Sequence, residues 1–552
     1  STNGVGVYLY ETSRISNTSG EIQINGTSSG GMGEGIYVID TSVVSTTTGD
    51  ISLTGRGSAA EWGALFEDVD IISTSGDITV DGGARGLVTG HYNTTNFGAT
   101  GSGTASGDIR FIFDRYWSGS SAVNFKTTGA VVFESAATQF SEATTLSTHT
   151  FTGHTSLTIG KTTNQSAVTL TGGSVNVVND YNVYGGAITQ TSAATSSAGS
   201  IYMNPTGAYA GAGALTATAG TVRVSGGTTV GPTGAIRALG TVTLSGSGAV
   251  TNSGATLTSL SSSVDVTSRT STVNMSAAIS AATTVSLTAS STVTTSAAIS
   301  AGTGAVTITS STANLSIGGA TAGTSVEMAP KTDYAGAGAL TASSGTVRIT
   351  GGTSVEPTGA IRATGDITLS GSAALSNSGA SLTSTAGSIA LTSTGSTVTI
   401  SAALSAPVNV TLTAHTALST SAAVTATAGT VTATSTTTSV AIGAAASGRF
   451  VEVTPATTYS GAGALTASAG TVRITGGTTI NTTGAVQATS NVVLRGSGDI
   501  TTSSSATLTS SGGTVEVTSS TGSVYLYVDA TAAASSPSTV GVLAKGANRV
   551  YL

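Results

Sequence analysis

Cysteine is absent from this chain of 552 residues, which excludes disulfide cross-links and thiolate metal sites. Charged residues make up only 8% of the chain, aromatic residues 5%, and there are 7 prolines. Intrinsically disordered chains combine high charge with low hydrophobicity. The shortage of charge therefore argues against disorder and in favour of a folded chain.

Other absences narrow the classes of function. The 18 Lys and Arg residues against 25 Asp and Glu residues give a net charge of -7 and form no basic patch, so no nucleic-acid partner is predicted. No run of 18 apolar residues occurs, so no helical membrane span is predicted. The sequence opens on STNGVGVYLY without a signal-peptide pattern, which we interpret as a mature end or a cut inside a longer precursor.

Helix-forming patterns are also missing. Glu, Lys and Gln are sparse, and no long stretch places apolar residues at the i, i+3, i+4 spacing of a helix. Val, Ile and Thr are abundant throughout and are interrupted by many of the 74 glycines. Because β-branched residues favour strands and glycine favours turns, an all-β fold is predicted.

A long tandem repeat organises the second part of the chain. YAGAGALTATAGTVRV starts at Tyr209, YAGAGALTASSGTVRI at Tyr334 and YSGAGALTASAGTVRI at Tyr459, a spacing of 125 residues. A chain that grows along one axis can copy such a unit freely, because each part contacts only its neighbours. The repeat therefore indicates a stacked architecture.

Each long repeat divides into six shorter units of nearly equal length. The first valines of successive strand motifs are Val222, Val242, Val264, Val285, Val306 and Val326, and the next long repeat restarts at Val347. Two further apolar positions follow at similar places in each unit, such as Val230 and Ile236 after Val222. A right-handed parallel β-helix, or β-solenoid, with coils of about 21 residues and three short strands per coil is predicted.

The spacing also predicts which residues are neighbours in adjacent coils. The outward position after the first valine is Glu327 in one coil and Arg348 in the next, and again Glu452 and Arg473. If the coils stack in register, each Glu lies beside its Arg on one face. Such exposed pairs contribute about 0.2–1 kcal/mol, so we interpret them as structural.

Residues 1–205 form a section with a different composition and a different repeat interval, and residues 206–552 form the regular section. GIYVIDTSVVSTTTGDISLTG at 35–55 aligns with GALFEDVDIISTSGDITVDG at 63–82, so the pattern returns at a longer interval than in the regular section. The section before residue 206 is therefore predicted to be a solenoid with larger coils. The long repeats that start near 209, 334 and 459 belong to the section after it.

The segment 84–126 interrupts the pattern of the first section. Apart from a strand at 109–113, we predict that it protrudes as a loop, and loops on rigid scaffolds often bind ligands. Its candidate surface-binding residues are His91, Tyr92, Phe97, Tyr116 and Trp117. The alternative is that Trp117 and the phenylalanines fill a wider core.

The GDISLTG and GDITVDG motifs, the Ser/Thr-rich segments between them and the long imperfect repeats resemble filamentous haemagglutinin-like β-strand-repeat exoproteins of bacteria. Two-partner-secreted adhesins and autotransporter passengers belong to this group. The resemblance covers essentially the whole chain. It implies a right-handed parallel β-helix, secretion to the extracellular space or outer cell surface, and an adhesive, surface-layer or filament role.

The sequence contains no clear catalytic or metal-binding pattern. His149 and His154 are interpreted as exposed polar positions, since their spacing suits a metal site poorly. Glu67, Asp68 and Asp70 form an acidic cluster without the regular Asp/Gly spacing of calcium β-rolls. No G-x-S-x-G motif with acid and base partners occurs. No catalytic, cofactor-binding or metal-binding residue is predicted.

The sequence predicts a secreted structural or adhesive rod that is not an enzyme and needs no cofactor. A β-helix that binds or cleaves polysaccharides is the first alternative, and an ice-binding protein, suggested by Thr-x-Thr segments such as 292–296, is the second. The expected partner is a glycan or another cell-surface ligand, a second copy stacked end to end, or the continuation of a longer chain. The last two expectations rest on uncapped ends and on VYLY at both 7–10 and 524–527.

Overall fold

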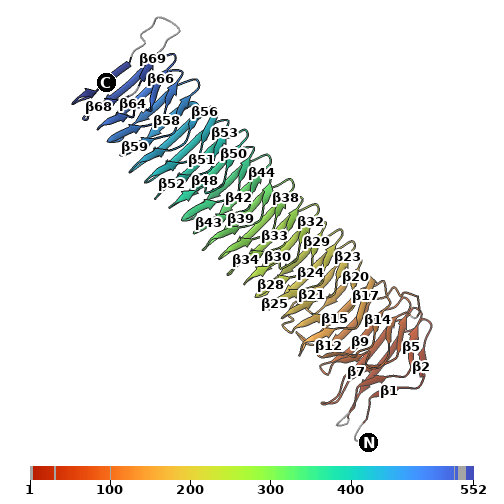
Figure 1. The fold of residues 1–552 in the computed structure, drawn as a ribbon. Coiled ribbons are helices and arrows are strands. Elements are labelled where there is room, and N and C mark those ends of the chain that lie inside the picture. Colours follow the sequence, from red (N-terminus) through yellow and green to blue (C-terminus); the bar gives the residue numbers. More distant parts are fainter. Residues whose placement is uncertain (1–3, 30–32, 100, 528, 533–541, 552) are drawn as a thin grey trace. The chain divides into compact units, whose positions relative to one another are not determined.

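The computed structural model describes residues 4–29, 33–99, 101–527, 529–532 and 542–551. These residues form strands, turns and connections, and no helix. The strands pair in parallel as a β-solenoid of about 22 turns with a spacing of about 21 residues (Figure 1). The chain divides into two compact units, residues 1–282 and 283–552. The predicted all-β solenoid is confirmed.

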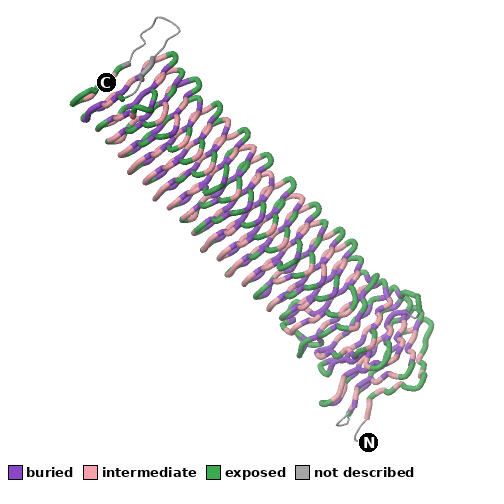
Figure 2. Tube along the Cα trace, viewed as in Figure 1, coloured by how far each residue is buried: buried purple, intermediate pink, exposed green. Residues whose placement is uncertain are grey.

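Each coil contributes one strand to each of three faces, as predicted. In one regular coil these strands are β27 (Val222–Ser225), β28 (Thr229–Pro232) and β29 (Ile236–Ala238). Val222, Val230 and Ile236 all point into the core. Figure 2 shows the resulting alternation of buried strand positions and exposed corners within each unit.

The predicted coil period is confirmed by the pairing register. In the first unit Val222 pairs with Val242, and Val242 with Val264. In the second unit the same series continues from Val285 through Val306, Val326 and Val347. Parallel stacking satisfies the backbone N–H and C=O groups of each coil through the coils on either side.

The predicted Glu–Arg neighbours are also confirmed. Glu327 is in register with Arg348, and Glu452 with Arg473. Neither pair is among the ion pairs formed by the described residues. The register therefore comes from the buried valines, and the outward charges follow it.

The coils that carry the candidate site are the larger ones near the amino terminus. Their first face consists of β1 (Val7–Leu9), β4 (Ile36–Val38), β7 (Ala64–Phe66), β10 (Leu87–Thr89) and β13 (Tyr116–Ser118). Their second face consists of β2 (Arg14–Ser16), β5 (Val43–Thr46), β8 (Asp70–Ser73), β11 (Thr95–Gly98), β14 (Val123–Phe125) and β17 (His149–His154). Their third face consists of β3 (Ile22–Thr27), β6 (Ile51–Arg56), β9 (Ile78–Gly83), β12 (Ile109–Phe113), β15 (Val131–Glu134) and β18 (Leu157–Ile159).

Coil length falls along the first unit. Ile22 pairs with Ile51 near the amino terminus, whereas Tyr181 pairs with Ile201 further along the chain, so the later coil contains fewer residues. The large coils of the first unit thus lie before residue 206. The division between the compact units, at 282/283, falls among the regular coils and is separate from the change of coil length predicted at 205/206.

The prediction that most of segment 84–126 protrudes as a loop is wrong. The segment contains β10 to β14, and β10 is paired on both sides: Leu87 with Ala64 and with Tyr116. Phe97, Phe111 and Phe125 on these strands are buried, so they extend the core instead of leaving it. Even the Gly- and Ser-rich stretch 101–108, between β11 and β12, pairs with the next coil, since Ala105 forms a parallel bridge with Thr127.

Phenylalanine rings fill the core of these larger coils, as the alternative interpretation of segment 84–126 predicted. Phe97 stacks on Phe125, with ring centroids 5.9 Å apart, and Phe125 stacks on Phe151 at 5.2 Å. On the third face Phe111 stacks on Phe133 at 5.2 Å. A larger coil encloses a wider interior, and aromatic side chains supply the volume that valine and isoleucine supply in the short coils.

The G-D-I motif has a structural explanation at the corner before the third face. The Asp77 backbone N–H donates to Asp50 Oδ1, and the Asp108 N–H donates to Asp77 Oδ1, both at 2.8 Å. The Ala130 N–H donates in turn to Asp108 Oδ1 at 2.7 Å. Each aspartate therefore binds the backbone of the next coil at the corner, where regular strand pairing stops.

Candidate functional site

Of the five predicted surface-binding residues, the structure brings three together on the outside and places two in the core. Phe97 and Tyr116 are buried. Tyr92 and Trp117 are 70% and 43% exposed, and His91 lies between them. Its ring centroid is 3.8 Å from that of Tyr92 and 4.6 Å from that of Trp117. Strand alternation explains the split, since Tyr116 points inward and its neighbour Trp117 outward.

These three residues belong to a larger surface that the segment 84–126 alone did not reveal. The strands of the first face are short, and their middle residues form one row in register: Tyr8, Tyr37, Leu65, Val88 and Trp117. We call this row, together with Tyr10, His91 and Tyr92, the aromatic face. It lies entirely within the first unit.

The outer tyrosines of the aromatic face stack on one another. Tyr8 lies 5.0 Å from Tyr10 and 5.2 Å from Tyr37 between ring centroids. Tyr8 and Tyr10 are 47% and 46% exposed, whereas Leu65 and Val88 in the same row are buried. The face therefore has an apolar floor between two groups of accessible rings.

Acidic side chains surround these rings. Glu67 is buried and its Oε1 lies 2.6 Å from His91 Nδ1. Burial, followed by the charges of Glu67, Glu34 and Asp40, raises the pKa of Tyr37 to about 12. Burial also raises the pKa of Tyr8, so the phenol groups of Tyr8 and Tyr37 act as neutral hydrogen-bond donors and acceptors in an acidic setting.

The acidic cluster of Glu67, Asp68 and Asp70 does not converge on one point. Glu67 pairs with His91, Asn93 Nδ2 donates to Asp68 Oδ2 at 3.5 Å, and Asn96 Nδ2 donates to Asp70 Oδ1 at 2.8 Å. Within the described ranges, no group of three or more His, Asp or Glu side chains is arranged to hold a metal ion. These carboxylates organise the corner after β7.

The expectation that His149 and His154 are exposed is wrong, since both are buried in the aromatic core. His149 Nε2 forms a hydrogen bond with the Tyr116 hydroxyl, which also lies 2.6 Å from Thr89 Oγ1. His154 Nδ1 lies 2.7 Å from the Thr127 carbonyl oxygen. Burial lowers the pKa of His149 to about 3 and also lowers that of His154, so both imidazoles are neutral near pH 7.

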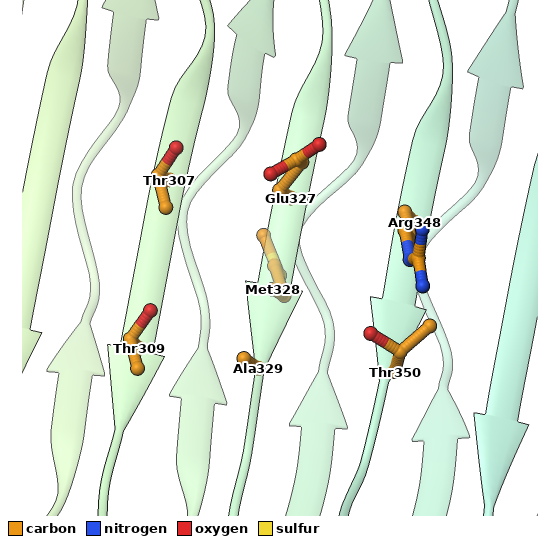
Figure 3. Close-up of a pocket in the computed structure, with 7 residues that line it drawn as sticks. All are labelled: Thr307, Thr309, Glu327, Met328, Ala329, Arg348 and Thr350. Atoms are coloured by element: carbon orange, nitrogen blue, oxygen red, sulfur yellow. The ribbon is translucent and has the colours of Figure 1, made fainter.

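The surface of the second unit carries a shallow depression of about 270 Å³. Figure 3 shows Glu327 and Arg348 beside it on adjacent strands, β42 (Val326–Ala329) and β45 (Val347–Thr350), with threonines around them. Glu452 and Arg473 occupy the same pair of positions in the next long repeat. The pair of side chains thus belongs to the repeated surface of the coils.

The sequence reasoning missed Tyr8, Tyr10 and Tyr37. The signal was present, because VYLY at 7–10 and IYV at 36–38 each place a tyrosine between two inward-facing apolar residues. Only the coil register shows that these tyrosines and Trp117 share one face.

No known protein family, curated protein or solved structure matched the chain. Among the described residues, no helix has the length and apolar character needed to cross a membrane.

Proposed function

We propose that the chain is a structural and adhesive β-solenoid of a bacterial cell surface or extracellular filament. The observation that carries this proposal is repetition: about 22 turns follow one another with a spacing of about 21 residues, and the outward Glu–Arg pair recurs from one long repeat to the next. In a solenoid each added coil extends the stack without altering its neighbours. Such a chain provides length and a large exposed surface.

The aromatic face supports the adhesive part of the proposal. Four of its rings are between 43% and 70% exposed and gather on one side of a few coils. Exposed aromatic groups of this kind mark interaction surfaces more often than scattered single residues do. We propose that this face attaches the chain to a glycan or another cell-surface ligand.

We further propose that the chain belongs to the filamentous haemagglutinin-like exoproteins and is secreted out of the cell. This assignment is supported by the sequence resemblance together with the solenoid fold. Export of the chain fused to a reporter, with the reporter recovered outside the cell, is the result that this assignment predicts.

The adhesive role is tested by the binding of labelled chain to bacterial cells, host cells and insoluble polysaccharides. Tyr92→Ala with Trp117→Ala should reduce the bound fraction several-fold, because both side chains are exposed. Tyr202→Ala is the matched control, since Tyr202 is a half-buried outward tyrosine on β24 (Ile201–Pro205), a third-face strand. The proposal would be overturned if Tyr202→Ala lost binding while the double variant kept it. Release of oligosaccharides from any polysaccharide would also overturn it.

A further inference from the structure

A hollow lies at the corner between the first and second faces, next to the exposed rings of the aromatic face. Its volume is about 200 Å³, and three successive coils line it with Thr41, Asp68, Val69, Asp70, Thr94 and Asn96. Thr94 follows Tyr92 by two residues, and Tyr92 is 70% exposed. We call this feature the acidic hollow, and it borders the aromatic face.

The carboxylates of the acidic hollow have no basic partner among the described residues. The ion pairs formed by these residues include neither Asp68 nor Asp70. Both carboxylates accept hydrogen bonds from neutral amides instead, Asp68 from Asn93 at 3.5 Å and Asp70 from Asn96 at 2.8 Å. Their two negative charges are therefore available to a positively charged ligand.

Two neighbouring basic side chains are engaged elsewhere. The Arg115 guanidinium lies over the Trp62 ring, 4.5 Å from its centroid, and its Nε is 3.2 Å from Glu142 Oε1. His91 is paired with the buried carboxylate of Glu67. The charge around the acidic hollow therefore favours a cation over an anion.

The two exposed rings beside the acidic hollow are held in place by the fold. The Ser121 hydroxyl donates to the Tyr92 carbonyl oxygen at 2.7 Å, which ties the Tyr92 corner to the next coil. Trp117 is in register with Val88, and the His91 ring contacts both Tyr92 and Trp117. An aromatic ring packs against the apolar face of a sugar ring and also attracts a cation. Rings positioned in advance lose less conformational entropy on binding.

We infer that the ligand of the aromatic face is a polysaccharide with protonated amino groups, which places sugar rings on Tyr92 and Trp117 and an ammonium group in the acidic hollow. This inference rests on the proposed adhesive function and specifies the class of its ligand. An anionic polysaccharide would bring like charges together at Asp68 and Asp70, which opposes binding. A neutral polysaccharide would leave both carboxylates without a partner.

The length of the aromatic face favours a polymer over a small cation. Tyr37, Leu65, Val88 and Trp117 occupy one row on four adjacent strands. Since paired strands are about 4.8 Å apart, Tyr37 and Trp117 are separated by about 14 Å. One sugar ring covers only part of this row, whereas a chain of several sugars can follow it.

Short chitosan oligomers, whose amino groups are free, and the same oligomers after N-acetylation are the probes for this inference. Calorimetric titration is carried out at a mildly acid pH, where the sugar amines are protonated and the aspartates are ionised. The chitosan oligomers should bind on the order of ten-fold more tightly than the N-acetylated ones. Added salt should weaken the binding of the chitosan oligomers more than that of the N-acetylated oligomers.

Asp68→Asn with Asp70→Asn removes both charges and keeps an oxygen that accepts the hydrogen bonds of Asn93 and Asn96. This double variant should bind both kinds of oligomer with the same Kd, because the preference depends on charge. Asp265→Asn is the matched control, since Asp265 is a half-buried outward aspartate on β33 (Val264–Ser268), a third-face strand. It should keep the ten-fold preference.

Equal binding of the two oligomers by the original chain, or an unchanged preference in the Asp68/Asp70 variant, would overturn the inference. Tighter binding of polylysine than of the chitosan oligomers would also overturn it, because the favoured partner would then be a basic protein. In each of these cases, the attachment of Tyr92→Ala with Trp117→Ala to cells judges the adhesive function separately. A several-fold loss there keeps the adhesive function without this class of ligand.

Discussion

At the residue scale, the Y-x-G segment that opens each long repeat is explained by packing in the core. Tyr209, Tyr334 and Tyr459 are buried with their rings in the core. A Cβ at Gly211, Gly336 or Gly461 would overlap the hydroxyl of the tyrosine two residues earlier. Because residues i and i+2 point to the same side of a strand, only glycine leaves room for the ring. The Y-x-G motif is therefore explained by the packing of the tyrosine ring in the core.

The hydroxyls of these tyrosines lead to the first prediction. The Tyr209 and Tyr334 hydroxyls are buried and have no hydrogen-bond partner. Removing an unsatisfied buried hydroxyl should not cost stability, so Tyr209→Phe should leave the free energy of unfolding in urea unchanged or raise it by about 1 kcal/mol.

Tyr181→Phe is the matched comparison. The Tyr181 hydroxyl donates to Gln190 Oε1 at 3.0 Å in a fully buried setting. Its removal leaves that oxygen without a donor and should lower the free energy of unfolding by about 1–2 kcal/mol. Equal losses for Tyr209→Phe and Tyr181→Phe would contradict the assigned hydrogen-bond pattern.

The buried histidines predict how stability depends on pH. Burial holds the pKa of His149 at about 3, below the value of about 6.5 in an unfolded chain. Between these values the unfolded chain binds a proton that the folded chain does not. The contribution of His149 to stability is therefore complete above about pH 6.5 and is lost as the pH falls towards 3.

His149→Phe should flatten that dependence between pH 7.5 and pH 5, because phenylalanine fits among Phe125, Phe133 and Phe151 and does not titrate. One such group changes the free energy of unfolding by about 1.4 kcal/mol per pH unit. The urea midpoint of each chain across this range is the measurement. His415→Gln, at an exposed histidine, is the matched control.

At the element scale, the corner aspartates connect one coil to the next. Asp77→Ala would remove the acceptor of the Asp108 N–H and should lower the free energy of unfolding by about 1 kcal/mol. Asp77→Asn should restore most of that loss, since Asn409 and Asn491 accept the same kind of backbone hydrogen bond in later coils. Equal losses for both variants would show that the carboxylate charge matters more than its acceptor role.

Much of the architecture was predictable at this scale. The spacing of Val222, Val242 and Val264 predicted the coil and its register, because buried valines in stacked strands must coincide. The same logic correctly paired Glu327 with Arg348. Segment 84–126 was misread because aromatic residues and glycines hid a strand alternation that the wider coils accommodate.

The candidate site was less predictable. Trp117, Tyr92 and His91 stood out by residue type, but Tyr8 and Tyr37 join them only through coils whose lengths vary from one to the next. His149 and His154 were misread because nothing in a local sequence tells a buried imidazole on a wide coil from an exposed one.

At the scale of the whole molecule, the coil is the unit of structure, and we expect no single coil of the regular section to be essential. In the second unit, Leu315 pairs with Tyr334 and Val440 pairs with Tyr459 in equivalent positions. Removing residues 334–458, one long repeat, would bring Tyr459 into the place of Tyr334. Arg473 would then lie beside Glu327 in the place of Arg348.

Thermal unfolding of this deletion variant, followed by far-UV circular dichroism, tests the central claim most directly. The account predicts that the shortened chain keeps its strand signal and cooperative unfolding, since every interface between coils is restored. Deleting residues 334–448 instead shifts the register within a coil and leaves one mismatched interface between coils, so it should lower the unfolding temperature and split the unfolding into more than one step. An unfolded 334–458 variant, or equal behaviour of the two deletions, would contradict the account.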